Sequence, residues 1–533
     1  ASPSNGIAQR KERQAMAKNW RRSLSSLGYS MQPTYKDETA VGFQYVLCEP
    51  VDVDLAREVT DADLLEGQEG AVADRYVGSR HGSTVTVAFP LRTFSTAYDP
   101  TSDDPTVHLA PEYGLIAPFF GCGPSTAETG TAQAGAASAI TLAAGASAVD
   151  DTFNNQIIEI TGGTGSGQFN KITDYVGASK VATVENAWTT TPDATSTYSI
   201  VINPNQPTHT SVYDANDVDS ASGVSITHTA GTYKGGDFYV AATTGTADAA
   251  PTMGWIQEGN TGAAVTKLFE PPQYLPVSGD ETFPTLTYYM STTQPQPLTM
   301  RLVGDSQSNA GLVLIGCIPQ SVTISFDPRS VPRAEVVYTC TDYRWDNTIE
   351  GLHIPTDAHK VPPVLGTNNG RATMGNTSDA ATTSAGAVQC GLGSVSFSIT
   401  NEIAYTACHS AAQGVESATI TKRTVRAEFT VPHESTDPIY DAAGNTATSG
   451  QHKWSSYLER GVQRSIAFYV GANVSKCFSL FMPAAKVVEQ PSLVDQEGVY
   501  GYNVAVEAST YAGDTDDGNK GSAGDSNVRI GIG

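Results

Sequence analysis

The residue best placed to act as a nucleophile is Ser306, which follows Gly304 and Asp305. A serine hydroxyl becomes nucleophilic when a histidine base lies within hydrogen-bond reach and a third group orients that base. The base would be expected in a late Asp-x-x-His segment. No such segment occurs, because His359 stands only two positions after Asp357. The triplet therefore favours a polar turn at a strand end, and an esterase is the least supported function.

Two other kinds of segment have the residue types of a ligand site without its spacing. The glycine-rich stretch 162–167 is followed by Gln-Phe instead of the Lys-Ser/Thr of a phosphate loop, so it predicts a turn between strands. The acidic run 514–517 lacks the terminal glutamate of a calcium loop, and Asp214, Asp217 and Asp219 are equally weak candidates. The sequence therefore predicts no catalytic residue, no cofactor and no metal.

The cysteines also argue against a metal site or a disulfide scaffold. There are seven, an odd number, and no two have Cys-x-x-Cys spacing. Cys317 and Cys340 stand inside apolar stretches that are typical of buried strands. Buried free thiols in a reducing compartment are the expected state.

The charge balance excludes a protein that wraps around nucleic acid. The 533 residues carry 31 Lys+Arg and 55 Asp+Glu, a net charge of −24, and charged residues make up only 16% of the chain. Such an acidic body does not neutralise phosphates and is repelled by an anionic membrane surface. No run approaches the roughly 20 apolar residues of a membrane span, and no apolar core follows the basic N-terminus. We therefore expect synthesis in the cytoplasm and no membrane insertion.

The first 40 residues form a basic segment of their own. Met16, Trp20, Leu24 and Leu27 share one face of a helix predicted over 7–27. A solvated, frayed arm is the simpler interpretation. Because the rest of the chain is strongly acidic, we favour an arm that docks on a neighbouring copy. Its candidate inter-subunit residues are Arg10, Lys11, Arg13, Lys18, Trp20, Arg21 and Arg22.

The rest of the chain reads as mainly β, and two parts of it repeat one order of elements. Each part has a strand, a loop of about 20–30 residues, an alternating strand that ends at proline, and a short aromatic helix. A strand ending in Val-Gly, a strand ending in proline and a hairpin follow. The corresponding segments are 84–90 and 425–432, 111–120 and 452–460, 301–304 and 468–471, 311–319 and 476–483, and 322–340 and 487–509.

This order resembles that of the bacteriophage major tail tube protein family. Residues 312–338, LVLIGCIPQSVTISFDPRSVPRAEVVY, are similar to the closing hairpin of that family. Residues 139–200, with NQIIEITGGTGSG at 155–167 and AWTTTPD at 187–193, resemble a small β-module that recurs in phage structural proteins.

The resemblance implies two tandem tail-tube-like β-sandwich or barrel domains, each with a short helix, plus inserted small β-domains. The expected boundaries are 1–40 for the arm, 41–122 with 276–346 for a discontinuous first tube domain, 123–275 for inserted exterior β-modules, 347–385 for a linker, 386–511 for the second tube domain and 512–533 for an acidic, glycine-rich tail.

A function follows from the same resemblance. Tube proteins stack as six-domain rings around a DNA channel, so three duplicated chains would make one ring of a virion tail. The expected partners are further copies, the tape measure, terminator and baseplate or tip proteins, and DNA that passes without sequence preference. The candidate lumen acids are Glu49, Asp52, Asp54 and Glu402, which flank the first strand of each repeat. The alternative is a virion decoration protein or adhesin whose 123–275 region binds host glycans; neither function is enzymatic.

Overall fold

The computed structural model is mainly β, as predicted, with antiparallel sheets and two short helical segments in its described part. It describes residues 26–32, 43–57, 59–62, 74–77, 80–92, 110–121, 126–148, 150, 152–154, 156–201, 209–214, 225–228, 238–241, 252–255, 265–268, 282–290, 294–295, 297–304, 311–327, 330–346, 370–376, 388–389, 394–408, 414–433, 439–443, 446–470, 478–496, 498–510 and 527–532.

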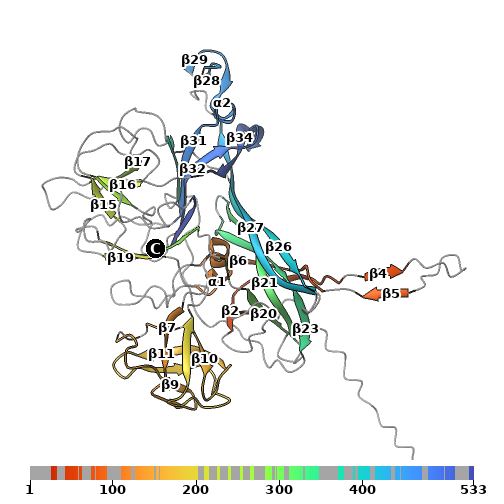
Figure 1. Cartoon of the computed structure of the whole chain (residues 1–533). Coiled ribbons are helices and arrows are strands. Elements are labelled where there is room, and N and C mark those ends of the chain that lie inside the picture. Colours follow the sequence, from red (N-terminus) through yellow and green to blue (C-terminus); the bar gives the residue numbers. More distant parts are fainter. Residues whose placement is uncertain are drawn as a thin grey trace, which may run out of the picture.

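A curved antiparallel sheet of eight strands, the long sheet, runs through the centre of the molecule (Figure 1). Every neighbouring pair in it is antiparallel. In spatial order its strands are β3 (Asp52–Asp54), β6 (Ser83–Pro90), β22 (Arg333–Cys340), β21 (Gly311–Phe326), β26 (Val395–Ala407), β27 (Val415–Pro432), β34 (Val499–Ala508) and β33 (Ser492–Gln496).

Two further groups of strands complete the β structure around the long sheet. The first contains β2 (Gln44–Val46), β1 (Ser26–Met31), β20 (Leu298–Val303), the first part of β21 and β23 (Asp342–Asp346). The second contains β25 (Val388–Gln389), β24 (Gly370–Asn376), β31 (Gln463–Val470), β32 (Phe478–Val487), β35 (Arg529–Ile532), β19 (Thr282–Tyr289) and β14 (His209–Asp214).

Two strands change partners at a proline instead of ending there. Residues 311–315 of β21 pair with β23, whereas residues 321–326 pair with β26. The change follows Gly316, which has φ +65°, and a register shift between Pro319 and Ser321. In the same way β32 exchanges β35 for β34 around Pro483. The predicted strand ends at both prolines are therefore wrong, because a proline is tolerated where a strand bends and its ladder is interrupted.

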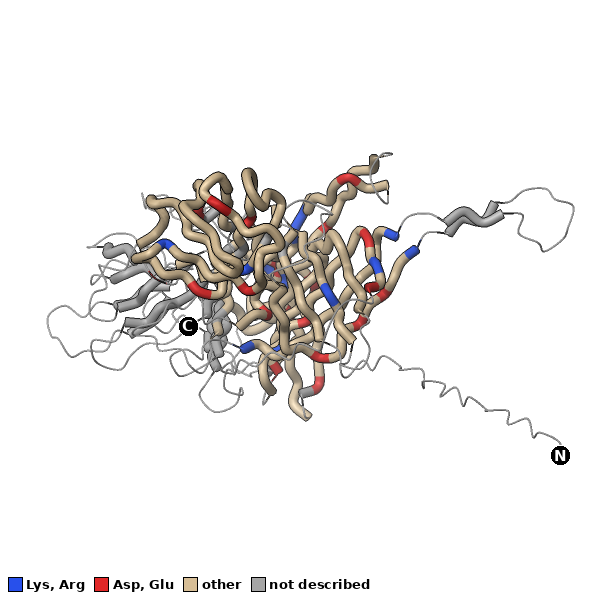
Figure 2. The backbone as a smooth tube through the Cα atoms, turned by 90° about the horizontal axis from the view of Figure 1, so that it is seen from below, with Lys and Arg blue, Asp and Glu red and all other residues tan. Residues whose placement is uncertain are grey.

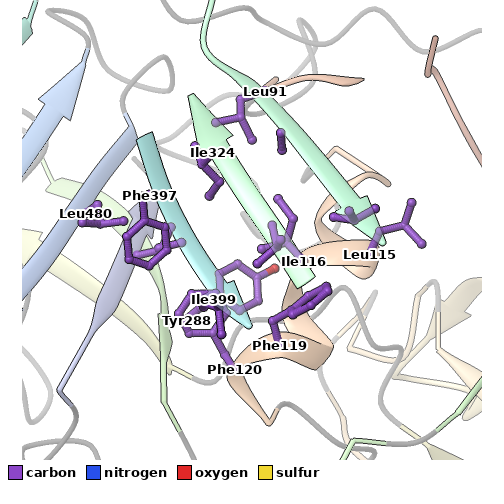
Figure 3. Close-up of a cluster of buried hydrophobic side chains, with 14 of the residues drawn as sticks. Leu91, Leu115, Ile116, Phe119, Phe120, Tyr288, Ile324, Phe397, Ile399 and Leu480 are labelled. Atoms are coloured by element: carbon purple, nitrogen blue, oxygen red, sulfur yellow. The ribbon is translucent and has the colours of Figure 1, made fainter. Parts of the chain in front are cut away.

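The main hydrophobic core lies against one face of the long sheet. Period-two alternation buries Val85, Val87 and Phe89 of β6, as the sequence predicts. The short helices α1 (Tyr113–Ile116) and η2 (Ala117–Phe120) contribute their side chains to this core, and Phe119 and Phe120 lie close to the strands (Figure 3). Each such side chain contributes about 1.5–3 kcal/mol by leaving water.

The predicted aromatic helix of the second repeat is confirmed as α2 (Lys453–Arg460). Trp454 and Tyr457 are buried on one of its faces, and Trp454 contacts Phe429 edge-on with ring centroids 5.9 Å apart. The helix ends at Gly461, whose φ of +60° is the left-handed conformation that glycine adopts without strain. In the part of the chain that the structure describes, no helix has the length and apolarity needed to cross a membrane.

Residues 126–201 form a separate small β-module. Its seven strands are β7 (Thr126–Thr131), β13 (Thr197–Val201), β10 (Ile157–Gly162), β11 (Phe169–Val176), β12 (Val181–Val184), β9 (Ala139–Thr141) and β8 (Ala134–Ala136). The module has its own core of apolar side chains, which includes Phe153, Tyr175 and Trp188. Its two ends are adjacent because Thr126 pairs with Val201.

Another four-stranded sheet is built from β15 (Ser225–His228), β18 (Val265–Leu268), β16 (Phe238–Ala241) and β17 (Thr252–Trp255). Strand β14, which also falls inside the predicted insertion, instead pairs with β19 beside the long sheet.

Several segments that the sequence predicts to be helix, linker, tail or loop contain strands. Leu27, placed at the end of a helix by its spacing, is fully buried in β1, since pairing with β2 and β20 overrides the local pattern. Strand β24 lies inside the predicted linker and β35 inside the predicted tail. The predicted long loops hold hairpins, formed by β4 (Val59–Ala62) with β5 (Asp74–Val77) and by the extended ends of β26 and β27.

Candidate functional surface

The face of the long sheet opposite the core is the candidate functional surface, and we name it the open face. Its side chains alternate along each strand with the buried ones. Cross-strand register aligns them in rows. One row runs Ala88, Glu335, Thr323, Ser398, Arg426 and Glu507, and the next runs Pro90, Arg333, Ser325, Ser396, Glu428 and Ala505.

Hydroxyl side chains dominate the open face. They are short and neutral, and they come from four different strands. A surface of this kind offers hydrogen bonds without a fixed charge. Its hydroxyl residues are Thr84, Thr86, Ser321, Thr323, Ser325, Ser396, Ser398, Thr400, Thr424 and Thr430.

Arg426 on β27 is held between two carboxylates. Its Nη2 lies 2.8 Å from Oε1 of Glu428, and its Nη1 lies 2.6 Å from Oε1 of Glu489. The hydrogen bond from Arg426 holds the pKa of the exposed Glu489 carboxyl below its usual range. The same contact raises the pKa of the Arg426 guanidinium. The arginine is therefore fully charged and already paired.

The other two bases on the described part of the open face are paired as well. Arg333 forms an ion pair with Glu49, and Lys422 Nζ lies 3.2 Å from Oε1 of Glu402. Exposed pairs of this kind stabilise a fold by only about 0–1 kcal/mol each, but they cancel the local positive potential. Figure 2 shows acidic and basic positions interspersed over the described strands. Acidic side chains on or beside this face outnumber the bases; they are Glu49, Asp52, Asp54, Glu335, Glu402, Glu428, Glu489 and Glu507.

The four predicted lumen acids lie on or beside the open face but do not form a cluster. Asp52 and Asp54 point from β3 at one edge, and both are exposed. Glu49 precedes this strand, and Glu402 stands on β26, from which β3 is separated by three other strands. The predicted arm residues between Arg10 and Arg22 lie outside the described residues.

Sequence reasoning missed the paired bases and Glu428 and Glu489. The signal was present, because Arg426 and Glu428 alternate with the buried Val425, Ala427 and Phe429. Only the buried half of that alternation was interpreted.

The motifs with possible chemistry occupy ordinary structural positions where the structure describes them. Residues 163–167 form the predicted turn between β10 and β11, and Gly163, Gly165 and Gly167 have positive φ angles there. Gly304 follows β20, whereas Asp305 and Ser306 lie outside the described residues, as do 514–517, Asp217 and Asp219. Asp214 ends β14. Among the residues described, no three His, Cys, Asp or Glu side chains are grouped so that they could hold a metal ion.

A buried ion pair fixes the segment that leads into β3. Arg92 and Glu112 are 5% and 1% exposed, and a guanidinium nitrogen of Arg92 bonds to Oε1 of Glu112. The same Oε1 accepts the backbone N–H of Leu47 at 3.1 Å. Burial raises the pKa of the Glu112 carboxyl, and the Arg92 guanidinium opposes that rise. The pair thereby ties β6, α1 and the β2–β3 segment together.

The long sheet ends at β3 on one side and, beside residues 499–503 of β34, at β33 on the other, whereas residues 506–508 of β34 pair with β32. The β33–β34 hairpin exposes three large apolar or aromatic side chains. Leu493, Val499 and Tyr500 are 61%, 57% and 69% exposed. An exposed apolar strand at a sheet edge is a template for pairing with another chain.

No family model matches this chain, and no curated protein has a significantly similar sequence. The long sheet, its open face and its two edges are therefore the features of the molecule that bear on function.

Proposed function

We propose that this protein is a structural virion protein that assembles into stacked rings, forming a phage tail tube through which DNA leaves the capsid. The observation that carries the proposal is the junction between β21 and β26. Six consecutive register pairs, from Ser321–Thr400 to Phe326–Val395, join the two halves of the chain into one sheet.

The strand order supports a tandem pair of tube domains. The first half contributes β3, β6, β22 and β21 in that spatial order, and the second contributes β26, β27, β34 and β33. The β21–β26 junction thus joins the last strand of one set to the first strand of the next. Repeating it between β33 of one chain and β3 of another would extend the sheet, and three chains would close a barrel with no free edge.

The open face supports a DNA channel as the role of that barrel. DNA binding draws its energy from lysine and arginine groups that neutralise phosphates. Here Arg333, Lys422 and Arg426 already face carboxylates, and hydroxyls surround them. A wall of this composition lets DNA slide, because each of these three bases on the described part of the open face already has a carboxylate partner.

Electron microscopy of the purified, full-length protein tests the proposal directly. Hollow tubes built from rings of three chains are the expected result. Monomers that bind cells or glycans would instead favour a decoration protein or adhesin. Rings of six chains would contradict the tandem-domain arrangement.

Freeing Arg426 is expected to make the wall adhesive. In Glu428→Gln/Glu489→Gln, the guanidinium loses both carboxylates and becomes available to a phosphate. We expect duplex DNA to bind the double variant several-fold more tightly than the parent protein, with affinity falling as salt rises, in a fluorescence anisotropy titration.

A control variant, Asp441→Asn/Glu459→Gln, removes two negative charges outside the long sheet. It should leave DNA binding unchanged. If both double variants bound DNA more tightly than the parent by the same factor, the loss of net negative charge would explain the effect, and release of Arg426 would not. If neither variant bound DNA more tightly, the Arg426 pairs would not control adhesion.

The small module is expected to be dispensable for assembly. Because Thr126 and Val201 are neighbours, residues 127–200 can be replaced by a short Gly/Ser linker without separating the ends. Tubes should persist, with thinner walls in micrographs. A deletion of the whole predicted insertion, 123–275, would also remove β14, which pairs with β19. Loss of tubes in the 127–200 deletion would contradict an exterior, separable module.

A further inference from the structure

The first half of the chain contains a pair of cysteines at the place where two strands turn together. Cys317 on β21 lies opposite Cys340 on β22, one position beyond the Ile318–Thr339 register pair. Their Sγ atoms are 2.9 Å apart, and both side chains are fully buried. Both are free thiols in the structure. Two sulfurs at this separation are closer than ordinary non-bonded contact allows, so the backbone already brings both Cβ vectors toward one bond.

The pair lies where β21 bends and changes its pairing partners. On one side of it, residues 311–315 of β21 pair with β23; on the other, β21 enters the long sheet. Thr341, next to Cys340, donates its N–H to the carbonyl of Ile315 at 3.0 Å and its hydroxyl to the carbonyl of Gly316 at 3.3 Å. A covalent link here would fix the bend of β21 against the end of β22.

We propose that Cys317 and Cys340 are a modification site, forming an intramolecular disulfide once the protein leaves a reducing compartment. The oxidant is a small-molecule disulfide such as oxidised glutathione. One cysteine thiolate attacks it, forming a mixed disulfide and releasing one glutathione thiolate. The second cysteine then attacks the protein sulfur and releases the other. Two protein thiols lose two protons and two electrons, and one small disulfide becomes two thiols.

Burial determines when this reaction takes place. It raises the pKa of the Cys317 thiol and keeps small molecules away, so the closed corner reacts slowly. The bond therefore forms while the corner is open, during folding or a local opening. Once formed, it is shielded from reductants in the same way. The inference is independent of the tube proposal, since it requires only a folded chain.

Peptide mapping of the full chain tests the site. The reduced protein is unfolded and refolded in excess oxidised glutathione, free thiols are blocked with N-ethylmaleimide, and the product is digested with trypsin. Cleavage after Arg301, Arg329, Arg333 and Arg344 places each cysteine in its own peptide, 302–329 and 334–344. We expect these two peptides to be recovered as one cross-linked species, lighter than their sum by two hydrogens. Full alkylation of both cysteines, or linkage of either to another cysteine or to glutathione, would overturn the proposal.

A second measurement separates the bond from the packing of the sulfurs. The midpoint of thermal unfolding should be higher for the oxidised protein than for the same protein in reductant. In Cys340→Ala, this difference between redox conditions should disappear. Cys48→Ala, a variant in a described but only partly buried thiol, should keep the difference. An unchanged redox effect in Cys340→Ala would assign the stabilisation to other cysteines and contradict the site.

Discussion

Leu493→Pro is expected to raise the protein concentration needed for ring formation by roughly tenfold or more while leaving the chain folded. Gln496 and Val499 pair in register with only two residues between them, and the strand residues that flank so short a connection form a hydrogen-bonded pair. Hydrogen-bonding positions alternate along an antiparallel ladder, which directs the N–H of Leu493 toward the free edge. Proline at this position removes one donor from the edge and leaves the pairing with β34 intact.

The size of the effect follows from repetition around the ring. One hydrogen bond contributes about 1 kcal/mol, and the proline ring also blocks close approach of a neighbouring strand. Because each 1.4 kcal/mol is a factor of ten, a closed ring with three such junctions should need at least roughly tenfold more protein to assemble. Sedimentation of tubes over a concentration series measures this threshold.

A matched variant separates the backbone from the side chain. Leu493→Thr keeps the N–H and a residue suited to a strand, but it removes an apolar side chain that is 61% exposed. It should assemble with a threshold between those of the parent and the proline variant. Circular dichroism and thermal unfolding check that both variants remain folded. Normal tubes from Leu493→Pro would show that β33 is not the joining edge.

Period-two alternation predicted the buried faces of β6 and β26 because those strands bury one face and expose the other. For Leu27 the local pattern instead predicted a helix, because its spacing from Leu24 and Trp20 fits one helical face. Pairing with Leu302 of β20, 275 positions away in the sequence, decides its state, and no local pattern contains that information. Strands β24 and β35 were missed for the same reason: each is a strand because distant edges receive it.

The candidate surface was predictable in kind and not in detail. Acids flanking the first strand of each repeat suggested a non-adhesive face, and Asp52 and Asp54 do point outward from β3. The pairing of Arg426 with Glu489 needs a contact across 63 positions, which depends on the position of the loop after β32. Opposite charges at that separation in sequence carry no signal of proximity.

Arg92→Ala is expected to destabilise the fold by about 3–5 kcal/mol, because it leaves the Glu112 carboxylate buried without its countercharge. Glu112 Oε2 already has no hydrogen-bond partner, and only backbone N–H groups, that of Leu47 among them, would remain as donors to the carboxylate. Arg92→Met/Glu112→Gln removes both charges at similar volume and should recover much of the loss. Lys422→Ala breaks an exposed pair and should change the free energy of unfolding by less than about 1 kcal/mol. Urea denaturation of the four proteins makes the comparison.

The free energy of unfolding of Arg92→Ala is also expected to depend on pH. Burial raises the pKa of the Glu112 carboxyl in the folded state, and without Arg92 only hydrogen bonds from backbone N–H groups oppose that rise. A folded-state pKa above the unfolded one means that the folded protein binds the proton more tightly. The free energy of unfolding of the variant should therefore increase, relative to the parent, as the pH falls from neutral toward about 5, and decrease as the pH rises through the folded-state pKa. The difference in the free energy of unfolding between the parent and Arg92→Ala could instead stay constant over this pH range. That result would mean that Arg92 acts through packing of its side chain, because the proposed coupling of stability to pH runs through the charge of Glu112.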